Sequence, residues 1–213
     1  MEIPGAEVFR YLGYRGAESD LRVSGLVKEL SVLFEASLEP KRVYGIWDCK
    51  VDSTTVTLGT MIIKSEDLAR RLEGCSRAAL LAATLGREAD TLIRRCSVQD
   101  MEKAVIAQAV CTAMIEAYCD KTEEEIAARQ DLQGLFRTKR FSPGYGDFDI
   151  ACQKDIVNAL SCDRKIGLTL TSACMLAPSK SVTAVIGFAK EMKQNLKKCR
   201  ECAGEQCEFR ENE

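Results

Sequence analysis

Residues 139–148, Lys-Arg-Phe-Ser-Pro-Gly-Tyr-Gly-Asp-Phe, form the most distinctive stretch of the chain. Pro143 fixes its own φ and disfavours helical backbone at the preceding serine, while the two glycines permit angles and close approaches that a side chain forbids. Arg140 can bind a carboxylate through two parallel charge-assisted hydrogen bonds, and Tyr145 can cover an apolar part of a ligand. These residues fit either a site for an amino-acid-bearing ligand or a Pro-Gly turn with a solvated arginine and a half-buried tyrosine.

Helical and extended patterns flank this loop on both sides. A capping pattern and apolar periodicity predict a long helix over about 97–120, and a second capping box predicts another over 122–134. Apolar residues occur on most faces of the first pattern, which indicates a helix packed centrally in the fold. After the loop, the sequence predicts a helix over 149–161 and extended segments over 168–176 and 181–187.

The N-terminal half mixes the two kinds of pattern. Helical periodicity covers 19–38, and a capped helix is predicted over 65–74. Residues 42–49 and 54–63 are predicted as paired strands, and 78–85 as a buried strand. Because strands and helices do not alternate as regular βαβ units, the pattern favours an α+β domain over an all-parallel α/β fold.

The composition of the 213 residues excludes several classes of function. Thirty Lys and Arg against 32 Asp and Glu leave a net charge of −2, which offers no positive field for nucleic acid. The absence of histidine removes imidazole-based catalytic triads and metal sites. No apolar run of about 20 residues suggests a membrane span, and neither a Walker loop nor a dinucleotide glycine fingerprint occurs. We therefore expect a cytoplasmic protein without nucleic-acid or membrane partners.

The eleven cysteines fall into two groups. Eight are scattered without the spacing of a disulfide framework, which indicates a reducing cytosol. Cys199, Cys202 and Cys207 cluster at the C-terminus, where three thiolates could bind one zinc ion or iron-sulfur cluster. A fourth ligand is left open between Cys174, Cys162, a small ligand and a second chain. The alternative is a charged tail with incidental thiols.

Three stretches resemble the reactivation domain of cobalamin-dependent methionine synthase, in the short form in which that domain is a separate polypeptide. Residues 140–145 look like the family's R-x-x-P-G-Y element. Residues 168–171, Leu-Thr-Leu-Thr, and 175–183, Met-Leu-Ala-Pro-Ser-Lys-Ser-Val-Thr, look like its next element. On this resemblance we divide the chain into an N-terminal helical segment (1–40), an activation-like domain (41–190) and a Cys-rich tail (191–213).

The resemblance implies a C-shaped α+β domain with a twisted antiparallel sheet, packed helices and a shallow site for S-adenosylmethionine. Such a domain restores methylcobalamin after cobalt(I) has been oxidised to cobalt(II), using an electron from flavodoxin or a ferredoxin-like donor and a methyl group from S-adenosylmethionine. The resemblance therefore also implies that this chain is an accessory subunit, catalytic only together with the cobalamin-binding domain of methionine synthase. Because cobalt is the nucleophile and the protein supplies positioning, a chain without histidine is compatible with this chemistry.

The resemblance also assigns site residues. Arg140 matches the arginine that binds the methionine carboxylate, Ser142 and Gly144 match backbone contacts to the ligand, and Tyr145 matches the tyrosine beside it. The family's acidic contacts to the ligand ammonium cannot be aligned, because Gly134 stands where one of them is expected.

Two acidic residues in and beside the loop, Asp147 and Asp149, can replace that acidic contact to the ligand or cap a helix.

Two other functions remain compatible with the sequence. One is an iron-sulfur or zinc-binding redox protein whose tail is the active centre, and metal content would identify it. The other is a reactivation factor for another corrinoid methyltransferase, which a co-purifying corrinoid protein would reveal.

Overall fold

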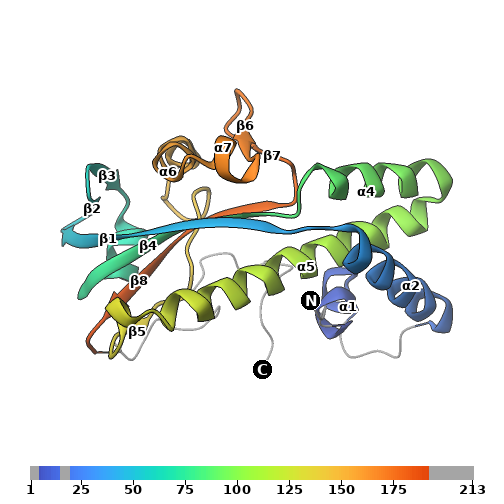
Figure 1. Ribbon diagram of the computed structural model, residues 1–213, viewed down its shortest axis with the longest axis horizontal. Helices are drawn as coiled ribbons and strands as arrows, with labels where there is room; N and C mark the ends of the chain where they lie inside the picture. Colours follow the sequence, from blue (N-terminus) through green and yellow to red (C-terminus); the bar gives the residue numbers. More distant parts are fainter. Residues whose placement is uncertain (1–4, 15–19, 192–213) are drawn as a thin grey trace.

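A six-stranded antiparallel sheet runs through the computed structural model, which describes residues 5–14 and 20–191 (Figure 1). The strand order is β3-β2-β1-β4-β8-β5. The strands are β1 (Lys41–Asp52), β2 (Thr55–Leu58), β3 (Met61–Lys64), β4 (Cys75–Thr84), β5 (Phe136–Arg137) and β8 (Ser181–Ala189), with β6 (Thr169–Leu170) and β7 (Leu176–Ala177) as a separate pair. The predicted α+β class with an antiparallel sheet is confirmed.

Helices cover both faces of this sheet. Helix α5 crosses one face with α1 and α2 packed against it, and α3, α6 and α7 cover the other (Figure 1). The helices are α1 (Gly5–Tyr11), α2 (Leu21–Ser37), α3 (Glu66–Leu72), α4 (Arg87–Gln99), α5 (Met101–Ala127), α6 (Gln153–Leu160) and α7 (Cys162–Ile166), with 3-10 turns η1 (Gln130–Leu132) and η2 (Ile150–Cys152).

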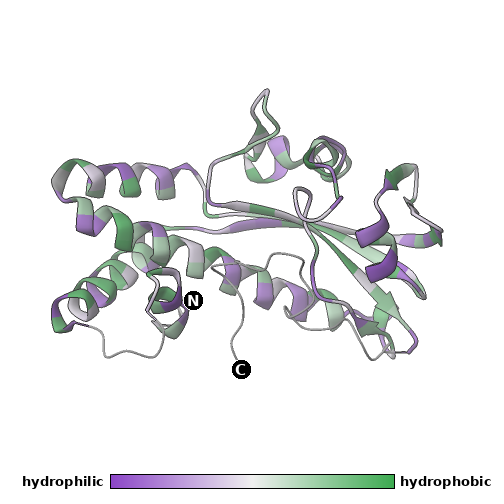
Figure 2. Ribbon diagram, turned by 180° about the vertical axis from the view of Figure 1, so that it is seen from behind, coloured by the Kyte–Doolittle hydropathy of each residue, from purple (hydrophilic) through white to green (hydrophobic). Residues whose placement is uncertain are grey.

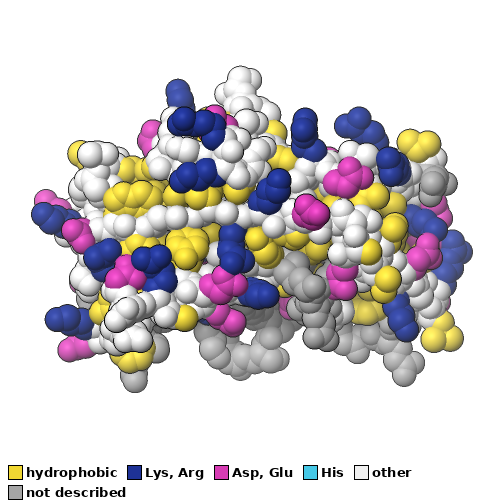
Figure 3. All heavy atoms as spheres, in the orientation of Figure 1, with side chains coloured by type: hydrophobic (Ala, Val, Ile, Leu, Met, Phe, Trp, Pro, Cys, Tyr) yellow, Lys and Arg dark blue, Asp and Glu magenta, His cyan; other side chains and the backbone are white. Residues whose placement is uncertain are grey.

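Strand β4 is buried on both faces, which explains its unbroken apolar run. Residues 78–83 alternate between the two core clusters, so that Ala79 and Leu81 pack toward α5 while Ala78 and Leu80 pack toward α3 and α6. This is the two-residue period of a strand between two helical layers. Strands β4 and β8 are mostly hydrophobic, whereas β1 and the flanking helices mix hydrophobic and hydrophilic residues (Figure 2). In the space-filling view, hydrophobic side chains appear above and below the sheet, between it and the helices (Figure 3).

One helix prediction was wrong, and one helix was not predicted. Helix α5 continues unbroken to Ala127, because the Thr122 hydroxyl donates to the Tyr118 carbonyl at 2.7 Å within the helix instead of capping a new one. The residues that follow Thr122 are strong helix formers, and the buried Ile126 holds them against the core. Helix α4 was not predicted, although Ile93 and three apolar neighbours form its buried side.

Other boundaries shifted in detail. The predicted strand 54–63 divides at Gly59, whose φ of +59° permits the turn between β2 and β3. The predicted extended segment 168–176 holds only β6 and the start of β7, and the predicted helix 149–161 divides into η2 and α6. Helices α2 and α3 and strands β4 and β8 confirm their predictions.

The eight cysteines within the described ranges are all free thiols. Burial raises the pKa of Cys111 and of Cys119 to about 12, so both stay protonated and unreactive at neutral pH. No helix in the described part of the chain is long and apolar enough to cross a membrane.

Candidate ligand-binding site

The distinctive loop folds into a tight turn beside β8. Phe141 exchanges two backbone hydrogen bonds with Val185, each 2.9 Å long, and the Gly144 N–H donates to the Phe148 carbonyl at 2.7 Å. The Phe148 ring is 1% exposed and stacks on Phe141 with 6.0 Å between centroids. The turn is therefore fastened to the sheet by both main chain and side chains.

Both glycines of the loop are required by its geometry. Gly144 and Gly146 have φ values of +93° and +56°, in the left-handed region that other residues rarely adopt. A Cβ atom on Gly146 would lie 2.1 Å from the Asp67 carboxylate, so a side chain does not fit there. This confirms the reason inferred from the sequence for two glycines after the proline.

The two acidic residues of the loop both serve as caps. The Asp147 carboxylate accepts hydrogen bonds from the Ser65 hydroxyl at 2.5 Å and from the Glu66 N–H at 2.6 Å, at the start of α3. Asp149 accepts from the Ala151 N–H at 2.8 Å and caps η2. Asp147 therefore fastens the loop to α3, and neither carboxylate replaces the missing acidic ligand contact.

The replacement Asp147→Asn is expected to lower the free energy of unfolding by about 1 kcal/mol at pH 7. The hydrogen bond from Ser65, followed by those from the α3 backbone, lowers the pKa of Asp147 in the folded state. Its stabilisation is therefore present above the unfolded-state pKa and is lost as pH falls through the lower folded-state value. Urea titrations should show a difference in unfolding free energy between variant and wild type at pH 7 that shrinks as the solution is acidified below the ordinary aspartate pKa. Glu39→Gln, at an exposed carboxylate in the connection between α2 and β1, should show no such difference at pH 7 or in acid.

A cavity of about 570 Å³ lies between α5, the loop and the start of β8. Arg140, Ser142 and Tyr145 line it, whereas Gly144 does not, because its role is in the turn. Tyr145 is 67% exposed and stands at the rim. A second cavity of about 640 Å³ lies beside α3 and contains none of the predicted site residues.

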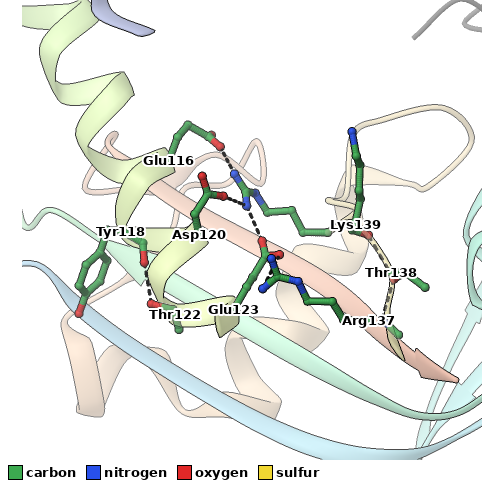
Figure 4. A network of polar contacts seen from close by, with 10 residues as sticks. Glu116, Tyr118, Asp120, Thr122, Glu123, Arg137, Thr138 and Lys139 are labelled. Carbon is green, nitrogen blue, oxygen red and sulfur yellow. Dashed lines mark hydrogen bonds and ion pairs between the residues drawn. The ribbon is translucent and has the colours of Figure 1, made fainter. Parts of the chain in front are cut away.

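The Arg140 guanidinium contacts three carboxylates from one face of α5, which are labelled Glu116, Asp120 and Glu123 in Figure 4. Its Nη1 lies 2.5 Å from Asp120 and also contacts Glu123, and its Nη2 contacts Glu116. Glu123 is nearly buried and also faces Arg137 at 3.8 Å. Burial alone would lower the pKa of Arg140, but the bonds to Asp120 and Glu123 and the charge of Glu116 raise it. The guanidinium is therefore permanently charged and fully compensated.

These carboxylates were missed in the sequence. Their signal was the spacing of Glu116, Asp120 and Glu123, which places acidic side chains at i, i+4 and i+7 on one helix face. Glu116 lines the cavity and uses only Oε2 on the arginine, and no described residue donates a hydrogen bond to its Oε1. The acidic contact sought near the loop is available from α5 instead.

The edge of β8 is open beside the cavity. The backbone groups of Val185 bond to Phe141, and those of Gly187 bond to Thr138, so both residues direct their N–H and C=O away from β4. Thr183, two residues earlier, directs its own N–H and C=O to the same side. Within the described ranges neither group has a hydrogen-bond partner, and Thr183 lines the cavity. A donor and an acceptor are thus available to a ligand.

The predicted metal ligands Cys199, Cys202 and Cys207 lie outside the described residues, so this site stays a prediction. Of the candidate fourth ligands, Cys162 is fully buried, and burial raises its pKa to about 11. Cys174 is half-buried in a left-handed turn with φ +58°. A metal needs an accessible thiolate, so Cys174 suits this role better than Cys162.

Comparisons with known proteins agree with this architecture. Residues 69–209 match the model of the family described as "Vitamin B12 dependent methionine synthase, activation domain". A similar solved structure is the crystal structure of the MetH reactivation domain bound to AdoHcy, with a TM-score of 0.66 and 15% sequence identity over 88% of this chain and 74% of that one. No curated protein matches. Because the family model covers well over half of the sequence, the chain belongs to the family of the vitamin B12 dependent methionine synthase activation domain.

Proposed function

We propose that the protein binds S-adenosylmethionine in the cavity between α5 and the 139–148 loop and supports reductive remethylation of a partner's corrinoid. Membership of the activation-domain family supports the reactivation role. The similar solved structure is bound to AdoHcy, which is what S-adenosylmethionine becomes when it gives up its methyl group. At about 570 Å³, the cavity is within the usual size range of small-molecule sites.

The main support for this proposal is that one cavity contains both charged side chains and an open edge of strand β8. The free oxygen of Glu116 can accept a hydrogen bond from the ligand ammonium, and the N–H and C=O of Thr183 match the donor and acceptor edge of an adenine. Tyr145 at the rim can stack on the ligand, and Ser142 contributes main-chain contacts. The ammonium group and the adenine edge of S-adenosylmethionine thus each have a matching group in the cavity.

The chain's contribution to the reaction is positioning. Corrinoid bound to the partner supplies a cobalt nucleophile that takes the methyl group. The protein would hold the sulfonium near Tyr145 at the rim of the cavity. The exposed apolar side chains of Tyr145, Ile150 and Met175 are then available for contact with a docked partner. We propose that the partner is the cobalamin-binding domain of methionine synthase and that a flavodoxin or ferredoxin-like protein donates the electron.

Replacement of Tyr145 by alanine tests the cavity directly. Because the side chain is 67% exposed, the fold should be unaffected, while loss of stacking should weaken S-adenosylmethionine at least fivefold. Titration calorimetry measures both affinities. Phe136→Ala, another exposed aromatic outside the cavity, should bind as the wild type does. Failure of the wild type to bind would refute the proposed function, and an unchanged affinity of Tyr145→Ala would remove that residue from the site.

The partner is tested by reconstitution. Methionine synthase inactivated by oxidation of its cobalamin should regain activity when the chain, S-adenosylmethionine and reduced flavodoxin are added together, and not when any one is left out. Recovery only with a different corrinoid methyltransferase would favour that alternative assignment. Iron and zinc analysis of anaerobically prepared protein tests the predicted metal site of the tail.

A further inference from the structure

Lys180 is a half-buried cation of the cavity that forms no ion pair within the described part of the chain, and Asp90 acts on its charge only from a longer distance. Its half-buried ammonium donates to the Thr112 hydroxyl at 2.9 Å and to the Gln108 carbonyl at 3.3 Å, both on α5. Among the residues that the structure describes, these two neutral acceptors leave one N–H of the ammonium without a partner. Across the described residues, no carboxylate lies within 4.0 Å of it. A partly desolvated charge of this kind favours an anionic ligand.

The position of this ammonium is fixed by the surrounding structure. The Lys180 carbonyl accepts from the Leu85 N–H at 2.9 Å. The preceding residue, Ser179, donates its N–H at 3.1 Å and its hydroxyl to Asp90 on α4. The side chain then crosses from this fastened loop to α5. It is therefore preorganised to meet a ligand at small entropic cost.

Arg140 is less suited than Lys180 to bind an anionic ligand. Its guanidinium already contacts Glu116, Asp120 and Glu123, so an incoming carboxylate would approach three like charges around one cation. Arg71, the remaining half-buried cation of the cavity, comes from α3 and lies over the Phe141 ring at 4.2 Å. Of these three cations, Lys180 alone lies on the α5 side without a carboxylate partner.

The spacing along α5 matches an amino-acid zwitterion. Thr112, which accepts a hydrogen bond from the Lys180 ammonium, is one helical turn from Glu116, whose Oε1 receives no hydrogen bond from any described residue. A cation and an anion thus face the cavity from adjacent turns, and the amino and carboxylate groups of an amino acid lie on one carbon. We propose that Lys180 is the counterion of the α-carboxylate of S-adenosylmethionine, with the ligand ammonium at Glu116. This inference rests on the proposed function and moves the carboxylate contact expected of Arg140 to Lys180.

Burial lowers the pKa of Lys180 in the free protein, which is the direction expected for an ammonium without an anion beside it. Bound carboxylate would offset that effect. The charged form of Lys180 is therefore more stable in the complex than in the free protein. This is expected of a residue that binds a ligand, whereas a purely structural lysine would already have its anion in the free protein.

The experiment compares two ligands on two proteins by titration calorimetry. The ligands are S-adenosylmethionine and its decarboxylated form, S-adenosylmethioninamine, which lacks only the carboxylate. Wild type should prefer S-adenosylmethionine by about 10- to 100-fold, the range for a hydrogen bond between charged groups. Lys180→Met should reduce that preference to within about threefold while binding the decarboxylated ligand as wild type does. Lys180→Arg, which keeps the charge, should restore most of the preference.

Controls separate this inference from the proposed function. Lys154→Met removes the same charge from exposed α6 surface and should keep the full preference. Thermal unfolding should place Lys180→Met within a few degrees of wild type, which shows that the fold is retained. Persistence of the preference in a folded Lys180→Met would overturn the inference while S-adenosylmethionine binding still stands. Binding of neither ligand by wild type would refute the proposed function and the inference with it.

Discussion

Replacement of Arg140 by methionine is expected to lower the free energy of unfolding by about 3 kcal/mol and to weaken S-adenosylmethionine binding, because the guanidinium holds Glu116 in place beside the cavity. Removing the guanidinium leaves three carboxylates facing one another on α5, and one of them, Glu123, is only 5% exposed. The larger part of the cost arises from Glu123, because water screens the more exposed Asp120. Urea denaturation at neutral pH measures the loss of stability, and calorimetry measures the loss of binding.

A second replacement identifies the cause of this effect. Arg140→Met combined with Glu123→Gln should recover at least half of the lost stability, since it removes the buried charge that the first change leaves unpaired. Arg70→Met, which breaks only an exposed ion pair with Asp67, should cost less than about 1 kcal/mol. Equal stability of Arg140→Met and wild type would show that the acidic face of α5 does not depend on this arginine.

Replacement of Phe148 by alanine is expected to cost about 3 to 4 kcal/mol of unfolding free energy. The ring is 1% exposed, stacks on Phe141 and fills the second core cluster, so its removal leaves a cavity under the loop. The Gly144 hydrogen bond to the Phe148 carbonyl holds the turn that presents Tyr145. We therefore expect weaker S-adenosylmethionine binding in addition to lower stability, and urea titrations with calorimetry measure both.

Two variants set the scale for this prediction. Phe148→Leu retains much of the buried volume and should lose less than half as much stability as Phe148→Ala. Phe136→Ala removes an aromatic ring that is 48% exposed and should change stability by less than about 1 kcal/mol. If Phe148→Ala unfolds at the wild-type urea concentration, the loop is not fastened to the core through this ring.

Local sequence signals predicted well the elements whose stability is local. The Ser65 cap predicted the start of α3, and the apolar run 78–83 predicted the doubly buried strand β4. They failed at Thr122, whose hydroxyl can either cap a new helix or donate to a carbonyl of the preceding turn. Burial of Ile126 in the core favours the continuous helix. They also failed to predict α4, because its few apolar residues give a weak helical pattern and the helix is stabilised by the core that these residues contact.

The sequence by itself determined that residues 139–148 form a turn, because a proline disfavours helix and two glycines permit the φ values of +93° and +56° found at Gly144 and Gly146. Only the tertiary structure decided how the charges around it are paired. Whether Arg140 is free or compensated depends on α5 residues 17 to 24 positions away in sequence, and whether Lys180 is paired depends on contacts 68 and 72 positions away. Coulomb interactions act through space and burial, so sequence neighbours cannot reveal them.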